Sequence, residues 1–182
     1  MAVVTERIVF LIFSRIVLVM SFILFSLSGY SQPDKAPEFE IQDLDGGVIK
    51  LSDYNGKVVY LDFWASWCGP CKLSFPWMEQ MYQKYGSQDL AIIAVNLDQD
   101  RKLADRFLAQ AGVHFIIGFD PGGITPLAYE IKGMPSSVII NRDGTIFSQR
   151  VGFNQHRQKE HEASIEALVS AAHQPLLVEK RN

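Results

Sequence analysis

The feature that most constrains this fold is the junction WASWCGPC, which joins an apolar segment directly to a helix-forming one. Residues 57–63, KVVYLDF, form an apolar run broken only by Asp62, which predicts a buried β-strand. Residues 72–85 predict a helix, which we expect Pro76 to kink. Both cysteines of the chain lie in the junction, so the strand and the helix determine where the two sulfurs lie.

Further strands and helices alternate along the chain. Asp45-Gly46-Gly47 predicts an early β-hairpin, and the turn at residues 141–144 predicts a second one between strands at 136–140 and 145–151. The remaining expected elements are strands at 90–97 and 113–119 and helices at 100–111, 126–131 and 160–172. Strands separated by helices, then a terminal hairpin and helix, predict an α/β fold with a mixed sheet covered on both faces.

Length and charge limit the function classes. A chain of 182 residues suffices for one domain with a substantial core. Hydrophobic residues make up 48% and charged residues 20%, which is typical of a soluble globular domain carrying one extra apolar segment. The net charge of −3 lacks the basic surplus with which nucleic-acid-binding proteins neutralise phosphates, so we expect no nucleic-acid partner.

The extra apolar segment lies at the N-terminus. Two arginines precede an uncharged apolar run at residues 16–27, and its length fits the core of a signal peptide. Gly29 and Ser31 then supply the small residues that signal peptidase requires, which predicts a signal peptide over residues 1–31. If the second arginine is tolerated near the membrane interface, residues 8–27 serve instead as an uncleaved membrane anchor. Both alternatives stay open.

The rest of the chain then divides into three parts. We expect a linker at residues 32–37, a folded domain at 38–174 and a C-terminal tail at 175–182. With either a signal peptide or an anchor, the N-terminal arginines stay on the inner side of the membrane. The folded domain is therefore expected in the periplasm or otherwise outside the cytoplasm, as a secreted or membrane-anchored protein.

Two other uses of the cysteine pair are weak. A structural staple with two intervening residues restrains the unfolded chain very little. A zinc site needs further ligands, and His156 and His161 stand five residues apart, which on a helix separates them by about 140 degrees. We expect no metal site, and we expect the histidines at the surface: His114, His156, His161 and His173.

A redox role explains more of the neighbourhood. The strand and helix place Cys68 at a helix N-terminus, where free N–H groups and the macrodipole favour a thiolate. Gly69 and Pro70 let the first turn begin without steric conflict, and Cys71 sits one turn inside, close enough to close a disulfide. Cys68 is thus the expected attacking sulfur, Cys71 the resolving one, and the thiol pair needs no cofactor.

The stretch DFWASWCGPCKLSFP resembles the active-site segment of thioredoxins. Together with the export segment, the APEFEIQDLDGGVIKLSDYNGK opening and GMPSSVIINRDG, the chain looks like the TlpA/ResA-like branch of extracytoplasmic thiol-disulfide oxidoreductases. The resemblance covers about residues 36–172. It implies a thioredoxin-like fold with helices on both faces of a central mixed sheet and an added N-terminal β-hairpin. Ser74 departs from the acidic residue common in cytochrome-maturation members, so the resemblance names no substrate.

The resemblance also implies roles for individual residues. Asp62 matches a buried acid that assists the second cysteine, and burial should push it toward the neutral form. Its alternative is a strand residue that reaches solvent at an edge. The lysine that neighbours this acid in thioredoxins has no counterpart here, since Ala94 or Val95 falls at its position.

A substrate-binding surface follows from the same resemblance. Pro135 matches the family's cis-proline that faces the disulfide, which would leave the backbone of Met134 free to pair with a substrate strand. We expect Trp67 on the contact surface and Trp64 in the core. The full expected surface is Trp67, Gly69, Pro70, Met134, Pro135 and Gly152.

The sequence therefore predicts a protein-disulfide reductase that acts on protein thiols and disulfides and receives electrons from a membrane thiol-transfer protein. Two other functions stay open. A thiol peroxidase of the redoxin group needs Thr and Arg groups to polarise peroxide, and no such cluster surrounds Cys68. A Cu(I) chaperone would use both thiolates and generally a histidine, for which His114 and the C-terminal group of histidines are the candidates.

Overall fold

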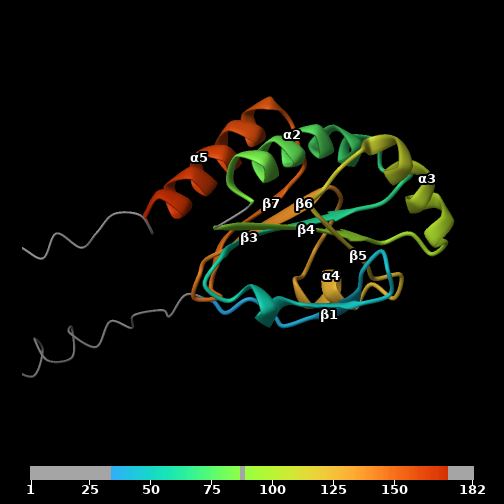
Figure 1. Ribbon diagram of the computed structural model, residues 1–182, viewed down its shortest axis with the longest axis horizontal. Coiled ribbons are helices and arrows are strands. Elements are labelled where there is room, and N and C mark those ends of the chain that lie inside the picture. The colour runs from blue at the N-terminus through green and yellow to red at the C-terminus, as the bar shows by residue number, and fades with distance from the viewer. Residues whose placement is uncertain (1–33, 87–88, 172–182) are drawn as a thin grey trace, which may run out of the picture. The chain divides into compact units, whose positions relative to one another are not determined.

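The computed structural model describes residues 34–86 and 89–171, which form a seven-stranded mixed sheet with helices on both faces (Figure 1). The sheet order is β2-β1-β5-β4-β3-β6-β7. The strands are β1 (Glu40–Gln42), β2 (Val48–Lys50), β3 (Val58–Trp64), β4 (Leu90–Asn96), β5 (Ile116–Phe119), β6 (Ser136–Ile140) and β7 (Ile146–Val151). The helices are η1 (Leu51–Tyr54), α2 (Gly69–Tyr85), α3 (Arg101–Ala111), α4 (Ile124–Ala128) and α5 (Gln155–Ala171).

The strand that carries the cysteine junction lies inside the sheet. β3 pairs in parallel with β4 and antiparallel with β6, and both predicted hairpins form, β1 with β2 and β6 with β7. Parallel neighbours need a crossover connection, which α2 and α3 supply between β3, β4 and β5. The predicted mixed sheet with an added N-terminal hairpin is therefore confirmed. The expected signal peptide and C-terminal tail fall outside the described residues.

Alternate residues of the central strands face two different cores. On one side α2, α3 and α5 cover the sheet, and Tyr60 and Trp64 of β3 pack there with Met78 of α2 and Ile165 of α5. On the other side lie α4 and the N-terminal hairpin, and the buried residues there include Leu61 and its strand neighbours. Because strand side chains alternate, Asp62 points to the same side as Tyr60 and Trp64, toward α2.

Some boundaries differ from the sequence-based expectations. α2 begins at Gly69, before the expected Lys72, because Pro70 fits the first turn of a helix, and it continues through Pro76. α4 spans residues 124–128 instead of 126–131, and β5 begins at residue 116 instead of 113. α5 begins at Gln155 instead of 160, because Asn154 accepts a hydrogen bond from the backbone N–H of Arg157 at 3.0 Å and so caps a polar first turn that apolar periodicity does not reveal. None of the helices within the described residues is long and apolar enough to cross a membrane.

Candidate active site

Cys68 lies directly before the start of α2, in the connection from β3, and Cys71 lies in the first turn of α2. A disulfide joins the two cysteines, whose Cα atoms are 5.3 Å apart. Cys68 caps the helix, and its Sγ accepts a hydrogen bond from the Cys71 backbone N–H at 3.3 Å. Cys68 is 6% exposed and Cys71 is fully buried. The N–H group and the helix dipole favour negative charge on the Cys68 sulfur, while Cys71 is sheltered from outside partners.

A buried carboxylate holds the loop that leads into the cysteines. Asp98 accepts hydrogen bonds from the Ser66 backbone N–H at 2.9 Å and from the Ser66 hydroxyl at 3.0 Å. It also accepts one from the Asn96 side chain at 2.9 Å and donates its own N–H back to Asn96 at 3.0 Å. This network ties the segment before Cys68 to the carboxyl end of β4, and so fixes the position of the exposed Trp67.

Asp62 lies in the interior of the sheet and is 1% exposed, so it does not reach solvent at an edge. Burial raises the pKa of its carboxyl group well above the usual range. Its Oδ2 atom has no hydrogen-bond partner among the described residues. In the sheet register Asp62 stands opposite Ala94 on β4 and opposite Ser137 on β6, so the only polar cross-strand neighbour comes from β6.

His161 corrects one prediction. We expected all histidines at the surface, but His161 of α5 is 2% exposed and lies 3.3 Å from the Ser137 hydroxyl through its Nε2 atom. It packs against the rings of Tyr60 and Trp77. His156, five residues earlier, has an 81% exposed side chain, as the helical rotation between them requires. Burial lowers the pKa of His161 to about 4.

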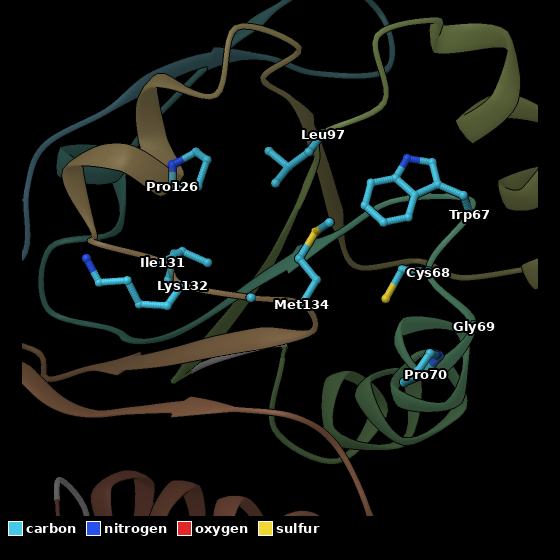
Figure 2. Close-up of a pocket in the computed structure, with 10 residues that line it drawn as sticks. Trp67, Cys68, Gly69, Pro70, Leu97, Pro126, Ile131, Lys132 and Met134 are labelled. Carbon is cyan, nitrogen blue, oxygen red and sulfur yellow. The ribbon is translucent and has the colours of Figure 1, made fainter.

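A groove of about 580 Å³ opens beside Cys68 (Figure 2). Figure 2 shows Trp67, Leu97 and Met134 around the same space as the Cys68 side chain. Trp67 is 68% exposed, and the predicted assignment of Trp67 to the surface and Trp64 to the core holds. The lining is mostly apolar, with one charged residue: Trp67, Cys68, Gly69, Pro70, Leu97, Pro126, Ile131, Lys132, Gly133 and Met134.

The segment before β6 closes one side of this groove. The Met134–Pro135 peptide bond is cis, as the sequence resemblance implied. The Gly152 N–H donates a hydrogen bond to the Pro135 carbonyl oxygen at 2.7 Å. Gly152 has a φ of 83°, a backbone conformation that residues with a side chain rarely adopt. Gly152 therefore supports the proline segment from behind and does not itself line the groove.

His114, one histidine candidate for a Cu(I) site, lies at the surface. His114 has a 72% exposed side chain and pairs with Glu79 through Nδ1 at 2.8 Å. His173 falls outside the described residues. Within the part of the chain that the structure describes, no group of three or more His, Cys, Asp or Glu side chains could hold a metal ion.

A family model described as Redoxin matches residues 32–168. The chain belongs to the redoxin family. This redoxin is 35% identical over 126 residues to thiol-disulfide oxidoreductase ResA of Bacillus thuringiensis (strain Al Hakam), a match that covers 69% of this chain and 73% of the relative. It is 36% identical over 116 residues to ResA of Bacillus subtilis (strain 168), covering 64% of this chain and 65% of the relative.

Solved structures agree with this redoxin in fold. A Chlorobium tepidum protein assigned as thiol:disulfide interchange protein DsbE shares 48% identity at a TM-score of 0.73, with 78% of this chain and 99% of that chain covered. StoA of Bacillus subtilis shares 26% identity at a TM-score of 0.60, with 72% and 99% covered. The redoxin therefore has a thioredoxin-like fold and is a thiol-disulfide oxidoreductase, which confirms the predicted fold and enzyme class.

Sequence reasoning missed two parts of this redoxin's site. The first is Asp98 with Asn96. Asn96 ends the apolar strand β4 and Asp98 follows two residues later, at the edge where the carboxyl ends of parallel strands gather functional groups. The second is His161 with Ser137. Its signal was the spacing of four residues between His161, Ile165 and Val169, which places all three on one helix face.

Proposed function

We propose that this redoxin reduces protein disulfides outside the cytoplasm through the Cys68–Cys71 pair. The observation that carries the proposal is the contrast between the two sulfurs. Cys68 stands at a helix N-terminus on the rim of an apolar groove, and Cys71 lies buried one turn inside. Such an arrangement lets one thiolate meet a partner while the other waits for an intramolecular step.

The reaction proceeds in two exchanges. The Cys68 thiolate attacks one sulfur of the substrate disulfide, forms a mixed disulfide and releases the other substrate sulfur as a thiolate, which takes a proton. Cys71 then loses its proton and attacks the Cys68 sulfur, which releases the second substrate thiol. Two electrons pass from the dithiol to the substrate, and the Cys68–Cys71 disulfide remains.

Asp62 is the proposed proton acceptor for Cys71. Its side chain points to the face of the sheet that α2 covers, where Cys71 is buried. A carboxylate with an ordinary pKa is a weak base for a thiol, whereas burial raises the pKa of Asp62 toward the range where proton exchange with a thiol is efficient. In the reverse direction the protonated Asp62 returns the proton to the departing Cys71 thiolate.

The groove is the proposed docking site for a segment of the substrate protein. Met134 supplies backbone N–H and C=O groups on the rim of the groove, and Trp67 supplies an exposed apolar surface on the same rim. Gly69 and Pro70 keep the approach to Cys68 free of long side chains. Pro135 and Gly152 act behind this surface, since Gly152 is bonded to the Pro135 carbonyl.

The N-terminal sequence supports the proposed location, and the location in turn suggests the electron supply. The apolar run at residues 16–27, behind two arginines, supports export by a signal peptide or retention by an anchor. Outside the cytoplasm a reductase is continually oxidised, so we propose a membrane thiol-transfer protein as its electron donor. The thiol pair itself carries both electrons and needs no bound cofactor.

The reduction potential of the pair in the full chain tests the direction. Equilibration with graded dithiol buffers should give a value near that of thioredoxin, about −270 mV. A value near that of DsbA, about −120 mV, would instead mean an oxidant. Hydrogen peroxide serves as the control substrate, because faster turnover with peroxide than with a protein disulfide would favour the peroxidase alternative.

Cys71→Ser provides the second test. This variant should accumulate a mixed disulfide on Cys68, because the resolving step is removed, and mass spectrometry of the trapped species identifies the substrate or the donor. The matched control is Cys68→Ser, which should trap nothing because Cys71 is fully buried. Equal trapping by both variants would contradict the assignment of Cys68 as the attacking sulfur.

A further inference from the structure

Asp62 belongs to a buried cluster of polar side chains whose other members have no role in the two exchange steps described above. The cluster consists of Tyr60, Asp62, Ser137 and His161, all less than 5% exposed and all on the face of the sheet beneath α2 and α5. On its β4 side Asp62 meets only Ala94, whereas Ser137 lies directly opposite on β6. Directly opposed residues on antiparallel strands have Cβ atoms about 5 Å apart, so the hydroxyl and carboxyl groups lie within reach.

Ser137 is in turn connected to α5. The Ser137 hydroxyl lies 3.3 Å from His161 Nε2, and this is the contact that links the sheet to a polar side chain of the helix. The rings of Tyr60 and Trp77 pack against the imidazole ring, with ring centres 5.5 Å and 5.9 Å away. A buried imidazole is costly unless a hydrogen bond compensates it, and Ser137 supplies that bond.

We propose that His161 is a positioning residue for the exchange reaction: its Nε2 accepts a hydrogen bond from the Ser137 hydroxyl, which turns the oxygen lone pairs of Ser137 toward the protonated Asp62 carboxyl group. This inference rests on the proposed role of Asp62. A serine hydroxyl has one proton to donate, so it cannot donate to His161 and to an ionised Asp62 at the same time. His161 thereby selects between two arrangements of the cluster.

The charges around the cluster are compatible with a neutral imidazole. Arg157 and Glu160 of the same helix and Arg150 of β7 face His161, and the two arginines disfavour a second positive charge. The Tyr60 ring faces it from β3. Burial is the main cause that raises the pKa of Tyr60, Asp62 adds to it, and an interaction with the Ser137 hydroxyl lowers it. α2 contributes the uncharged Trp77 ring. At pH 7 His161 is therefore neutral, and its Nε2 atom can accept a hydrogen bond from the Ser137 hydroxyl.

The proposal predicts the direction of a change in pH dependence. Without an acceptor on His161, the Ser137 hydroxyl can turn and donate to Asp62, and a hydrogen bond to a carboxylate favours the ionised form. The base then titrates at lower pH. One hydrogen bond corresponds to a shift of about 1 pH unit.

Stopped-flow reaction of the reduced full chain with the aromatic disulfide of thionitrobenzoate, at pH 5 to 9, measures this shift. The first thiol released reports attack by Cys68, and the second reports attack by Cys71, so each trace holds an internal control. His161→Leu should move the acid limb of the second phase down by about 1 pH unit and leave the first phase unchanged. His161→Gln, which keeps an acceptor, should retain the wild-type limb.

Two further variants isolate the route. In a Ser137→Ala background, His161→Leu should cause no additional shift, because the link is already absent. His156→Leu, at an exposed position of the same helix, should behave as wild type. An equal shift in the Ser137→Ala background, or no shift with His161→Leu, would overturn the inference. Asp62→Asn separates the two hypotheses: if that variant keeps the wild-type limb, the role of Asp62 itself is wrong.

Discussion

The two faces of the sheet differ in the polarity of the side chains that they bury. Beneath α4 and the hairpin, alternate residues of β3 and β6 form a wholly apolar layer: Val59, Leu61, Phe63, Val138 and Ile140. Beneath α2 and α5, the intervening residues of the same strands include Tyr60, Asp62 and Ser137. On the first face the hydroxyl of Tyr129 donates to the Pro37 carbonyl at 2.7 Å, whereas on the second the hydroxyl of Tyr60 has no hydrogen bond of ordinary geometry.

This difference indicates that one face of the sheet stabilises the fold and that the other carries the groups for proton transfer. An apolar layer gains free energy from every buried group, while a buried carboxyl without a full set of partners costs free energy. The buried polar groups that cost free energy lie on the face of the sheet where Cys71 is buried. The hairpin and α4 cover the opposite, apolar face. The four predictions below test this comparison between the apolar face and the polar face.

Introducing asparagine at either of two neighbouring positions should have opposite effects on the free energy of unfolding. Leu61→Asn places an unpaired amide in the apolar face and should lower the free energy of unfolding by about 3 to 5 kcal/mol. Asp62→Asn should raise it at pH 7. Because the pKa of Asp62 is higher in the folded than in the unfolded protein, the wild type loses stability as pH rises above the unfolded value. Urea unfolding at pH 4 and pH 7 checks both, and a destabilised Asp62→Asn at pH 7 would break the comparison.

The rate of the exchange reaction should depend on the polar face and not on the apolar face. Asp62→Asn should slow the attack by Cys71 on the mixed disulfide by about 10²-fold, because a positioned general base is lost. Leu61→Val is the control on the apolar face, and its rate per folded molecule should stay unchanged. Single-turnover release of the second thiol measures both rates. Equal slowing by the two variants would show that packing, not proton transfer, limits this step.

The polar face should also respond to acid. The pKa of His161 falls from about 6.5 unfolded to about 4 folded, chiefly because of burial, so the folded protein binds fewer protons between these values. Stability from this group is present above pH 6.5 and is lost as the pH falls toward 4, by at most about 3 kcal/mol. His161→Gln should lose less stability than the wild type over this range in urea titrations. Parallel curves for the two proteins would contradict the burial argument.

The smallest effect compares two buried tyrosines. Tyr129→Phe removes the hydrogen bond to Pro37 and should lower the free energy of unfolding by about 1 kcal/mol. Tyr60→Phe removes a hydroxyl whose contact with Ser137 lacks ordinary hydrogen-bond geometry, and it should leave stability unchanged or higher. Thermal unfolding of both variants at pH 7 provides the measurement. A larger loss for Tyr60→Phe would mean that its hydroxyl is paired in solution.

Much of the fold followed from local patterns. The strand that carries Asp62, the helix that begins beside Cys68 and both hairpins are each coded within a few neighbouring residues. Helix starts were less predictable: α5 begins at a polar turn capped by Asn154, which apolar spacing does not mark. The groove residues Leu97, Pro126 and Ile131 come from separate segments, so no local pattern joins them to Cys68.

The sequence by itself determined the position of the two sulfurs at a helix N-terminus and the burial of Asp62, because both depend on adjacent residues in one strand and one helix. Tertiary structure alone decided that Ser137 lies opposite Asp62 and contacts His161. Strand pairing and helix packing bring together residues that are far apart in the chain, and a period of two or of 3.6 residues gives the face a side chain occupies, not the partner it meets there. For that reason His161 was expected at the surface and is buried.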